Sequence, residues 1–161
     1  YKAIDKFLDF IYKNNLENKL RITIAGKALS EEYRDKIFAY QNDHIKIIHE
    51  FLDFDKLQSL IAQSKAVLFT YQGESVLSSG ALMDSLGCGA KVIGPEVGVF
   101  EELSYDDLIL GYDDFEGLMK TFLKNLDRAL MGIETDRLEK FVKINNWENF
   151  GDKFDEWLKN G

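Results

Sequence analysis

The stretch from Thr70 to Gly98 constrains the fold more than any other part of the chain. An apolar run at 66–69 ends in a polar loop, and the Ser-Ser-Gly sequence at 78–80 then opens a helix-length segment. A second apolar run follows at 91–94. Two short apolar runs joined through a helix are typical of a β-α-β unit with parallel strands. In such a unit the strand ends and helix starts line one crevice, which is where ligands bind in open α/β sheets.

The same alternation extends over most of the chain. From Asp113 onward the apolar spacing is helical only. Strands alternating with helices predict an α/β fold, a doubly wound, Rossmann-like parallel sheet with helices on both faces and a helical C-terminal segment. The single proline, Pro95, and the lack of a Gly/Pro-rich linker predict one domain over residues 1–161. Strands are predicted at 20–25, 44–50, 66–69, 91–94 and 108–110, and helices begin near residues 4, 30, 53, 79 and 100.

Charge and cysteine content narrow the classes of function. The formal net charge of −8 argues against a general nucleic-acid binder, because phosphate backbones are held by clustered Lys and Arg. It leaves room for one small phosphate ligand, which needs only a local nest of donors. The one cysteine, Cys88, excludes an internal disulfide and a cysteine-rich metal site. The apolar runs are shorter than the ~18 residues of a membrane span, and we see no signal-peptide pattern, so we expect a cytoplasmic protein.

The helix that starts at 78–80 has two interpretations. The free N–H groups of its first turn can receive an anion, and we expect a diphosphate there. Serine is also among the best N-cap residues, so the same residues can be only a helix cap. Gly80 favours a ligand, because glycine weakens a helix relative to alanine by about 0.8–1 kcal/mol and close approach of a group to the backbone would explain it.

Two acidic positions are candidates for ligand or metal binding. Asp84 lies one helical turn after Gly80 on about the same face, where its carboxylate can accept hydrogen bonds from a vicinal diol such as a ribose. An exposed helix aspartate without a ligand is an equal alternative. The Asp53-Phe54-Asp55 sequence has the Asp-x-Asp form that holds a metal–diphosphate in some sugar transferases, but two acids at a helix start also suit the cap and the dipole. We therefore expect no metal and no further cofactor.

In their order and spacing these segments resemble the C-terminal, donor-binding half of a GT-B glycosyltransferase, in particular the large retaining family 4 (glycosyl transferases group 1). The run SGALMDSLGCGAKVI at 79–93 is similar to the family's Ser-Gly, a helix with Glu-Ala, and then Gly-x-Pro-Val-Ile. Shorter matches are Tyr1-Lys2, the strand and glycine turn at 21–26, the segment 97–101 and Asn146-Trp147. The resemblance covers nearly the whole chain.

The resemblance also implies roles for individual residues. The first amides of the helix from Ser79 would hold the donor diphosphate, and Asp84 stands where the family has a glutamate that binds ribose hydroxyls. Lys2 would face the phosphates and offset charge on the leaving nucleotide, which makes it the expected catalytic residue. The nucleotide base is expected near the turn after Gly26. The implied donor-binding set is Gly26, Lys27, Leu52, Glu74, Ser78, Ser79, Gly80, Ala81 and Asp84.

The chain departs from the family pattern in three places. Val76 replaces the first of two glutamates found in many members, and Lys91 replaces a proline. The family's first strand of this domain, and its N-terminal acceptor-binding domain, would lie before Tyr1. We therefore expect the chain to be one half of a two-domain enzyme.

The implied activity is transfer of a sugar from a nucleotide-diphosphate sugar to an acceptor, with retention of configuration, in cell-surface polysaccharide or glycoconjugate synthesis. The acceptor can be membrane-associated, with the full-length protein lying peripherally at the inner membrane. Alone, the chain is expected to bind UDP or GDP weakly and to transfer no sugar. One alternative is a non-catalytic nucleotide-binding or assembly module derived from that fold. A second is a receiver-type signalling domain, which needs an aspartate at the carboxyl end of a strand, where this chain has Gly26, Glu50 and Thr70-Tyr71.

Overall fold

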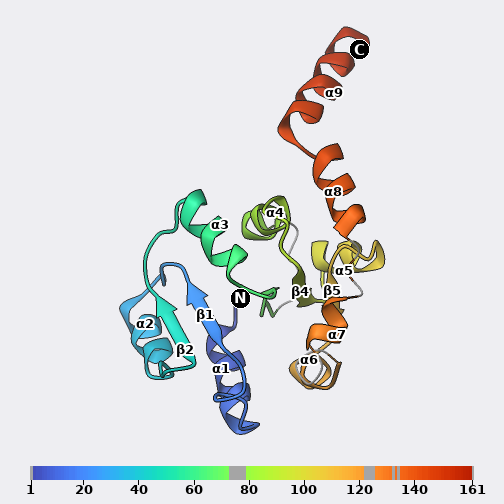
Figure 1. The fold of residues 1–161 in the computed structure, drawn as a ribbon. Coiled ribbons are helices and arrows are strands. Elements are labelled where there is room, and N and C mark those ends of the chain that lie inside the picture. The colour runs from blue at the N-terminus through green and yellow to red at the C-terminus, as the bar shows by residue number, and fades with distance from the viewer. Residues whose placement is uncertain (1, 73–78, 122–125, 132, 134, 161) are drawn as a thin grey trace.

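The computed structural model describes residues 2–72, 79–121, 126–131, 133 and 135–160 (Figure 1). It confirms the predicted class, an α/β fold with parallel strands, flanking helices and a helical C-terminal segment. The strands are β1 (Ile22–Ala25), β2 (Ile45–Ile48), β3 (Val67–Leu68), β4 (Val92–Pro95) and β5 (Leu110–Tyr112). The helices are α1 (Ile4–Lys13), α2 (Glu31–Phe38), α3 (Phe54–Ala62), α4 (Gly80–Gly87), α5 (Val99–Tyr105), α6 (Phe115–Thr121), α7 (Leu126–Leu130), α8 (Thr135–Ile144) and α9 (Trp147–Asn160).

The strands form two parallel sheets rather than one continuous sheet. β1 pairs with β2 in one sheet, with Ile22 opposite Ile45. β3, β4 and β5 form the other in that order. The last strand, β5, begins at Leu110 and ends at Tyr112, whereas the sequence analysis predicted a strand at 108–110. Leu108 and Ile109 are buried just before β5. Their apolar side chains are therefore explained by burial, and their backbones are not part of the strand.

Helix α1 packs against side chains of both sheets. Its Leu8, fully buried, contacts a cluster that includes Ile45 of β2. Phe7 and Ile11 belong to a different cluster, together with Ile93 of β4. The helix therefore joins the two sheets through side-chain packing, with one part of its apolar face on each.

A further cluster lies between the second sheet and helices α4 and α5. Leu82 and Leu86 of α4 meet Val92 of β4 and Phe100 of α5, and all four are essentially inaccessible to solvent. The hydroxyl of Tyr112 donates to the carbonyl of Phe69 at 2.8 Å, which fixes the carboxyl end of β5 against that of β3. This cluster positions the start of α4 beside the strand that precedes it.

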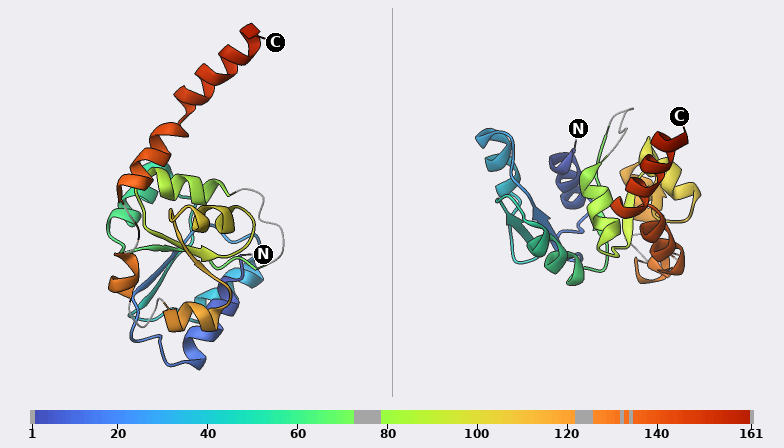
Figure 2. Two further views of the ribbon diagram at one scale, coloured as in Figure 1. Left: turned by 90° about the vertical axis from the view of Figure 1, so that its right-hand side faces the viewer. Right: turned by 90° about the horizontal axis from the view of Figure 1, so that it is seen from above.

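The C-terminal helix α9 extends away from the α/β body, as Figure 1 and the left view of Figure 2 show. Its aromatic side chains remain exposed, including Phe154 and Trp157. Their rings stack on each other, with centroids 6.0 Å apart. Among the described helices we find none that is both long enough and apolar enough to span a membrane.

Candidate functional site

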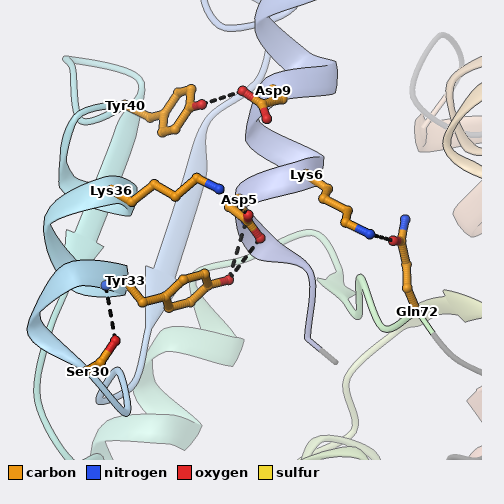
Figure 3. A network of polar contacts seen from close by, with 8 residues as sticks. All are labelled: Asp5, Lys6, Asp9, Ser30, Tyr33, Lys36, Tyr40 and Gln72. Carbon is orange, nitrogen blue, oxygen red and sulfur yellow. Dashed lines mark hydrogen bonds and ion pairs between the residues drawn. The ribbon is translucent and has the colours of Figure 1, made fainter.

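The carboxyl ends of the two sheets meet at the first turn of α1. The Thr70 hydroxyl, just beyond β3, donates to the Lys2 carbonyl at 2.6 Å. On the other side, Tyr33 in the first turn of α2 donates through its hydroxyl to the Asp5 carboxylate at 3.2 Å (Figure 3). Helix α2 follows β1, so its first turn marks the carboxyl end of β1, and Thr70 marks the carboxyl end of β3. Since both contact the start of α1, the carboxyl ends of the two sheets lie on the same side of the molecule. This is the edge at which parallel α/β sheets bind their ligands.

Asp5 also accepts from the Lys36 ammonium at 2.6 Å. The hydrogen bond from Lys36 is the main cause that lowers the pKa of the Asp5 carboxyl, and its charge and the Tyr33 hydroxyl add to the effect. Burial raises the pKa of Tyr33. Asp5 therefore carries a negative charge, which the ammonium of Lys36 neutralises. The contacts of Asp5 with Lys36 and Tyr33 hold α1 against α2.

Helix α4 begins at this edge with Ser79 as its N-cap. The Ser79 hydroxyl oxygen accepts from the Leu82 amide at 3.2 Å and lies 3.4 Å from the Tyr71 hydroxyl. Ser79 therefore caps α4. A single cap of this kind satisfies one of the first four helix N–H groups, so it leaves those of Gly80 and Ala81 for other acceptors.

The space beside Gly80 is open. Gly80 is exposed, and a Cβ added to it would meet no atom of the described residues within 4 Å. Its backbone angles do not require glycine either, since its φ is not positive. Within the described part of the chain, neither packing nor backbone strain explains the glycine, so close approach of an external group is a physical reason for it.

The remaining residues that were predicted to bind the donor diphosphate and ribose lie on α4, just before α1, or outside the described residues. Asp84 is exposed on α4. The pKa of the neighbouring Cys88 thiol is raised mainly by burial and, to a smaller extent, by the negative charge of Asp84. Lys2 is exposed directly before α1, with its carbonyl held by Thr70. Glu74 and Ser78, also predicted to bind the donor, lie outside the described residues.

The residues expected near the nucleotide base lie at the ends of β1 and β2. Gly26 has a φ of +137°, a conformation suited to glycine, and its amide donates to the Ile48 carbonyl at 3.0 Å. Lys27 lines a shallow pocket with 28–31, Arg34 and His49. Leu52 is half-buried in the following loop and is not among the residues that line this pocket.

Three residues of this edge were not singled out as ligand-binding from the sequence. Lys6 reaches from α1 to the β3–α4 connection, where its ammonium donates to Gln72 at 2.8 Å (Figure 3). Its position four residues after Lys2 is the signal that could have identified it. Arg34 and His49 join the pocket through the fold alone, because they lie on an α2 face and at the end of β2.

The acidic sequence at Asp53 serves the local helix. Asp53 accepts from the Lys56 amide at 2.9 Å and so caps α3, as the cap interpretation predicts. Within the residues that the structure describes, no three His, Cys, Asp or Glu side chains come together as a metal site.

Comparison with known proteins defines the class of fold. No family model and no curated protein matches the sequence. Among solved structures, the chain is similar to the crystal structure of AviGT4, a glycosyltransferase involved in avilamycin A biosynthesis, with a TM-score of 0.62 and 19% sequence identity. The match covers 99% of this chain and 49% of that one, so the chain spans about half the length of that enzyme. The chain therefore has a glycosyltransferase-like, Rossmann-like α/β fold.

Proposed function

We propose that this chain is the donor-binding half of a retaining glycosyltransferase of the GT-B type, similar to family 4. It would bind a nucleotide-diphosphate sugar such as a UDP or GDP sugar. The proposal is supported by the glycosyltransferase-like fold and, above all, by the open first turn of α4 at the carboxyl edge of the strands. The acceptor would be bound by a second domain, and the product would be a cell-surface polysaccharide or glycoconjugate.

The diphosphate would lie against the amides of Gly80 and Ala81. Charge on the leaving diphosphate grows as the bond to the sugar breaks, and fixed N–H groups and the positive end of a helix stabilise it without reorganising. An anion at this place needs no metal, because backbone donors and the dipole supply the opposing charge.

Lys2 would supply the mobile positive charge. It is exposed beside Thr70, at the end of the strand that leads toward α4. Lys6 approaches the same connection through Gln72 and would add to the positive potential felt by a phosphate. Asp84 would bind the ribose hydroxyls, and the turn at Gly26 and Lys27 would lie near the base.

Calorimetric titration of the chain with UDP and GDP, followed by a matched pair of glycine variants, tests the proposal. Gly80→Ala and Gly87→Ala alter opposite ends of α4, and neither added Cβ would meet an atom within 4 Å among the residues that the structure describes. We expect Gly80→Ala to weaken nucleotide binding about tenfold, which corresponds to about 1.4 kcal/mol. Gly87→Ala should leave the affinity unchanged.

Two results would remove the proposal. The first is the lack of any heat or spectral change with either nucleotide at millimolar concentration. The second is an equal loss of affinity in both glycine variants, which would mean that the first amides of α4 do not contact the ligand. Nucleotide binding without sugar transfer by the full-length protein would instead identify the non-catalytic nucleotide-binding module.

A further inference from the structure

We propose that the pocket at the carboxyl ends of β1 and β2 binds the base of the donor nucleotide and selects guanine over uracil and adenine. This base pocket is lined by residues 27–31, Arg34 and His49. The inference rests on the nucleotide binding proposed above, and it adds the identity of the base and the side chains that would recognise it.

The position and size of the base pocket suit a single ring system. The pocket and the start of α4 both lie at the carboxyl edge of the strands, which is what a nucleotide with its diphosphate on α4 requires. The volume of the pocket is about 270 Å³. Pockets that enclose a drug-sized ligand measure about 300–1,000 Å³, so this one has room for a base and not for a whole nucleotide.

Three charged side chains of the base pocket keep hydrogen-bonding capacity for a ligand. Arg34 donates through Nε and Nη2 to one carboxylate oxygen of Asp35, each at 2.8 Å. Its Nη1 lies 3.8 Å from Oε1 of Glu31, which is too long for a hydrogen bond. Lys27 forms no ion pair with any residue that the structure describes. The pocket therefore offers cationic donors on Lys27 and Arg34 and an acceptor on Glu31.

The imidazole of His49 is an incomplete part of the same pocket. Its Nε2 is shielded from solvent and has no hydrogen-bond partner among the described residues. The ring packs edge-on against Phe38, with centroids 6.2 Å apart. Buried polar atoms are normally paired, so an unpaired nitrogen beside a pocket is explained if ligand binding turns the ring and supplies the partner.

The charges at the start of α2 favour a neutral ligand over a phosphate. Glu31 and Glu32 both lie in the first turn of the helix. The Ser30 side chain already accepts from the Tyr33 amide at 3.2 Å (Figure 3). Two carboxylates repel a phosphate, whereas a neutral base that carries both donors and acceptors can pair with a carboxylate and with cations.

Guanine carries the hydrogen-bonding groups that this set requires. Its N1–H and 2-amino group are adjacent donors, which match the two oxygens of the Glu31 carboxylate. Its O6 and N7 are adjacent acceptors of the kind that Arg and Lys bind, which suits Arg34 and Lys27. Uracil has one ring N–H between two carbonyls, and adenine has an acceptor at N1, so each would direct an acceptor toward the carboxylate. A lost hydrogen bond to a charged group weakens binding by roughly tenfold to a hundredfold.

Calorimetric titration of the chain with GDP, inosine diphosphate, UDP, ADP and pyrophosphate tests the base pocket. Inosine diphosphate differs from GDP only in lacking the 2-amino group. Glu31→Gln removes the carboxylate that would recognise guanine. Its control is Glu32→Gln, which removes the neighbouring carboxylate, exposed and not among the residues that line the pocket. Both substitutions change the net charge and the first helical turn in the same way.

We expect GDP to bind at least about tenfold more tightly than UDP and ADP, with inosine diphosphate between them. Glu31→Gln should weaken GDP binding about tenfold and remove most of its advantage over inosine diphosphate, while UDP and pyrophosphate bind as before. Glu32→Gln should retain the preference of the parent chain.

The possible failures of the base assignment and of the proposed function are distinguishable. Equal affinity for GDP and UDP, or tighter binding of UDP, would overturn the selection of guanine and leave nucleotide binding intact. An equal loss of GDP affinity in the two glutamate variants would also overturn it, because the effect would then be one of charge alone. Binding of pyrophosphate without any nucleotide preference over it would remove the base pocket. Failure of all five ligands to bind would remove both the base assignment and the proposed function.

Discussion

Gly94 on β4 lies directly against the ring of Phe100 on α5, with no room for a side chain between them. Phe100 is fully buried among the residues that position α4. Replacing Gly94 by alanine would force the ring or the strand to shift, and overpacking of this kind costs about 1–3 kcal/mol. We expect Gly94→Ala to lower the free energy of unfolding by that amount in urea denaturation. Gly87→Ala, which adds the same methyl group in open space, is the control and should not destabilise the protein.

The pairing of Asp5 with Lys36 predicts a dependence of stability on acid. The pKa of Asp5 lies below its ordinary value of 3.8 in the folded state. As the pH falls below about 3.8, Asp5 takes up a proton in the unfolded state before it does so in the folded state. The free energy of unfolding therefore decreases with falling pH until the pH is below the pKa of Asp5 in the folded state. Asp5→Asn should cost about 1 kcal/mol at neutral pH and should flatten this part of the stability–pH profile. An unchanged profile would show that Asp5 is not the group responsible.

The buried hydroxyl of Tyr112 predicts the opposite behaviour in base. Burial raises its pKa above the ordinary value of 10.0. Folding therefore favours the neutral form of Tyr112. Its contribution to the free energy of unfolding is complete below pH 10 and decreases as the pH rises above the pKa that tyrosine has in the unfolded chain. Tyr112→Phe removes the donor to the Phe69 carbonyl, so we expect a loss of about 1–3 kcal/mol and a weaker decline of stability at alkaline pH. Chemical denaturation at pH 7 and pH 10.5 measures both effects.

The proposed contact of Asp84 with the ribose predicts different effects on nucleotides and on free pyrophosphate. Asp84→Asn should weaken UDP or GDP about tenfold, because hydrogen bonds to a charged group contribute about 1.5–3 kcal/mol, and should leave pyrophosphate affinity unchanged. Asp152→Asn, which neutralises an exposed aspartate on the distant helix α9, is the control. Parallel losses for nucleotide and pyrophosphate would contradict contact with the ribose.

The exposed aromatic residues of α9 should contribute little to the stability of the body. Phe154 is 49% exposed and Trp157 67% exposed. We expect the double variant Phe154→Ser/Trp157→Ser to unfold within about 0.5 kcal/mol of the parent, and to bind less of a fluorescent apolar dye. Leu86→Ala, which removes a buried side chain, should instead cost about 2–5 kcal/mol. A double variant as unstable as Leu86→Ala would show that the helix packs against the body.

Local patterns in the sequence were sufficient to predict the class of fold and the position of most elements. Ser30, Asp53 and Ser79 were each expected at a helix start, and each caps its helix through its own side chain. The division into two sheets could not be predicted, because strand pairing depends on distant residues and not on the pattern of a single strand. The apolar run at 108–109 likewise indicated burial without specifying which residues hydrogen-bond.

The candidate site was predictable only in part. Residues within one segment, such as Ser79, Gly80 and Asp84, keep their mutual spacing in any helix. Contacts between segments, such as that of Lys6 with Gln72, arise when α1 docks beside β3, and only the position of Lys6 relative to Lys2 indicated it.

The packing of α1 against both sheets has a consequence for cooperativity. In the described structure no backbone ladder connects the two sheets, so the 10 residues of α1 couple their unfolding through side chains alone. Truncating Ile11 would weaken the contact with the second sheet but leave Leu8 against the first. Because Ile22 of β1 and Leu68 of β3 also pack against one cluster, the two sheets would stay coupled, but the unfolding transition would become broader.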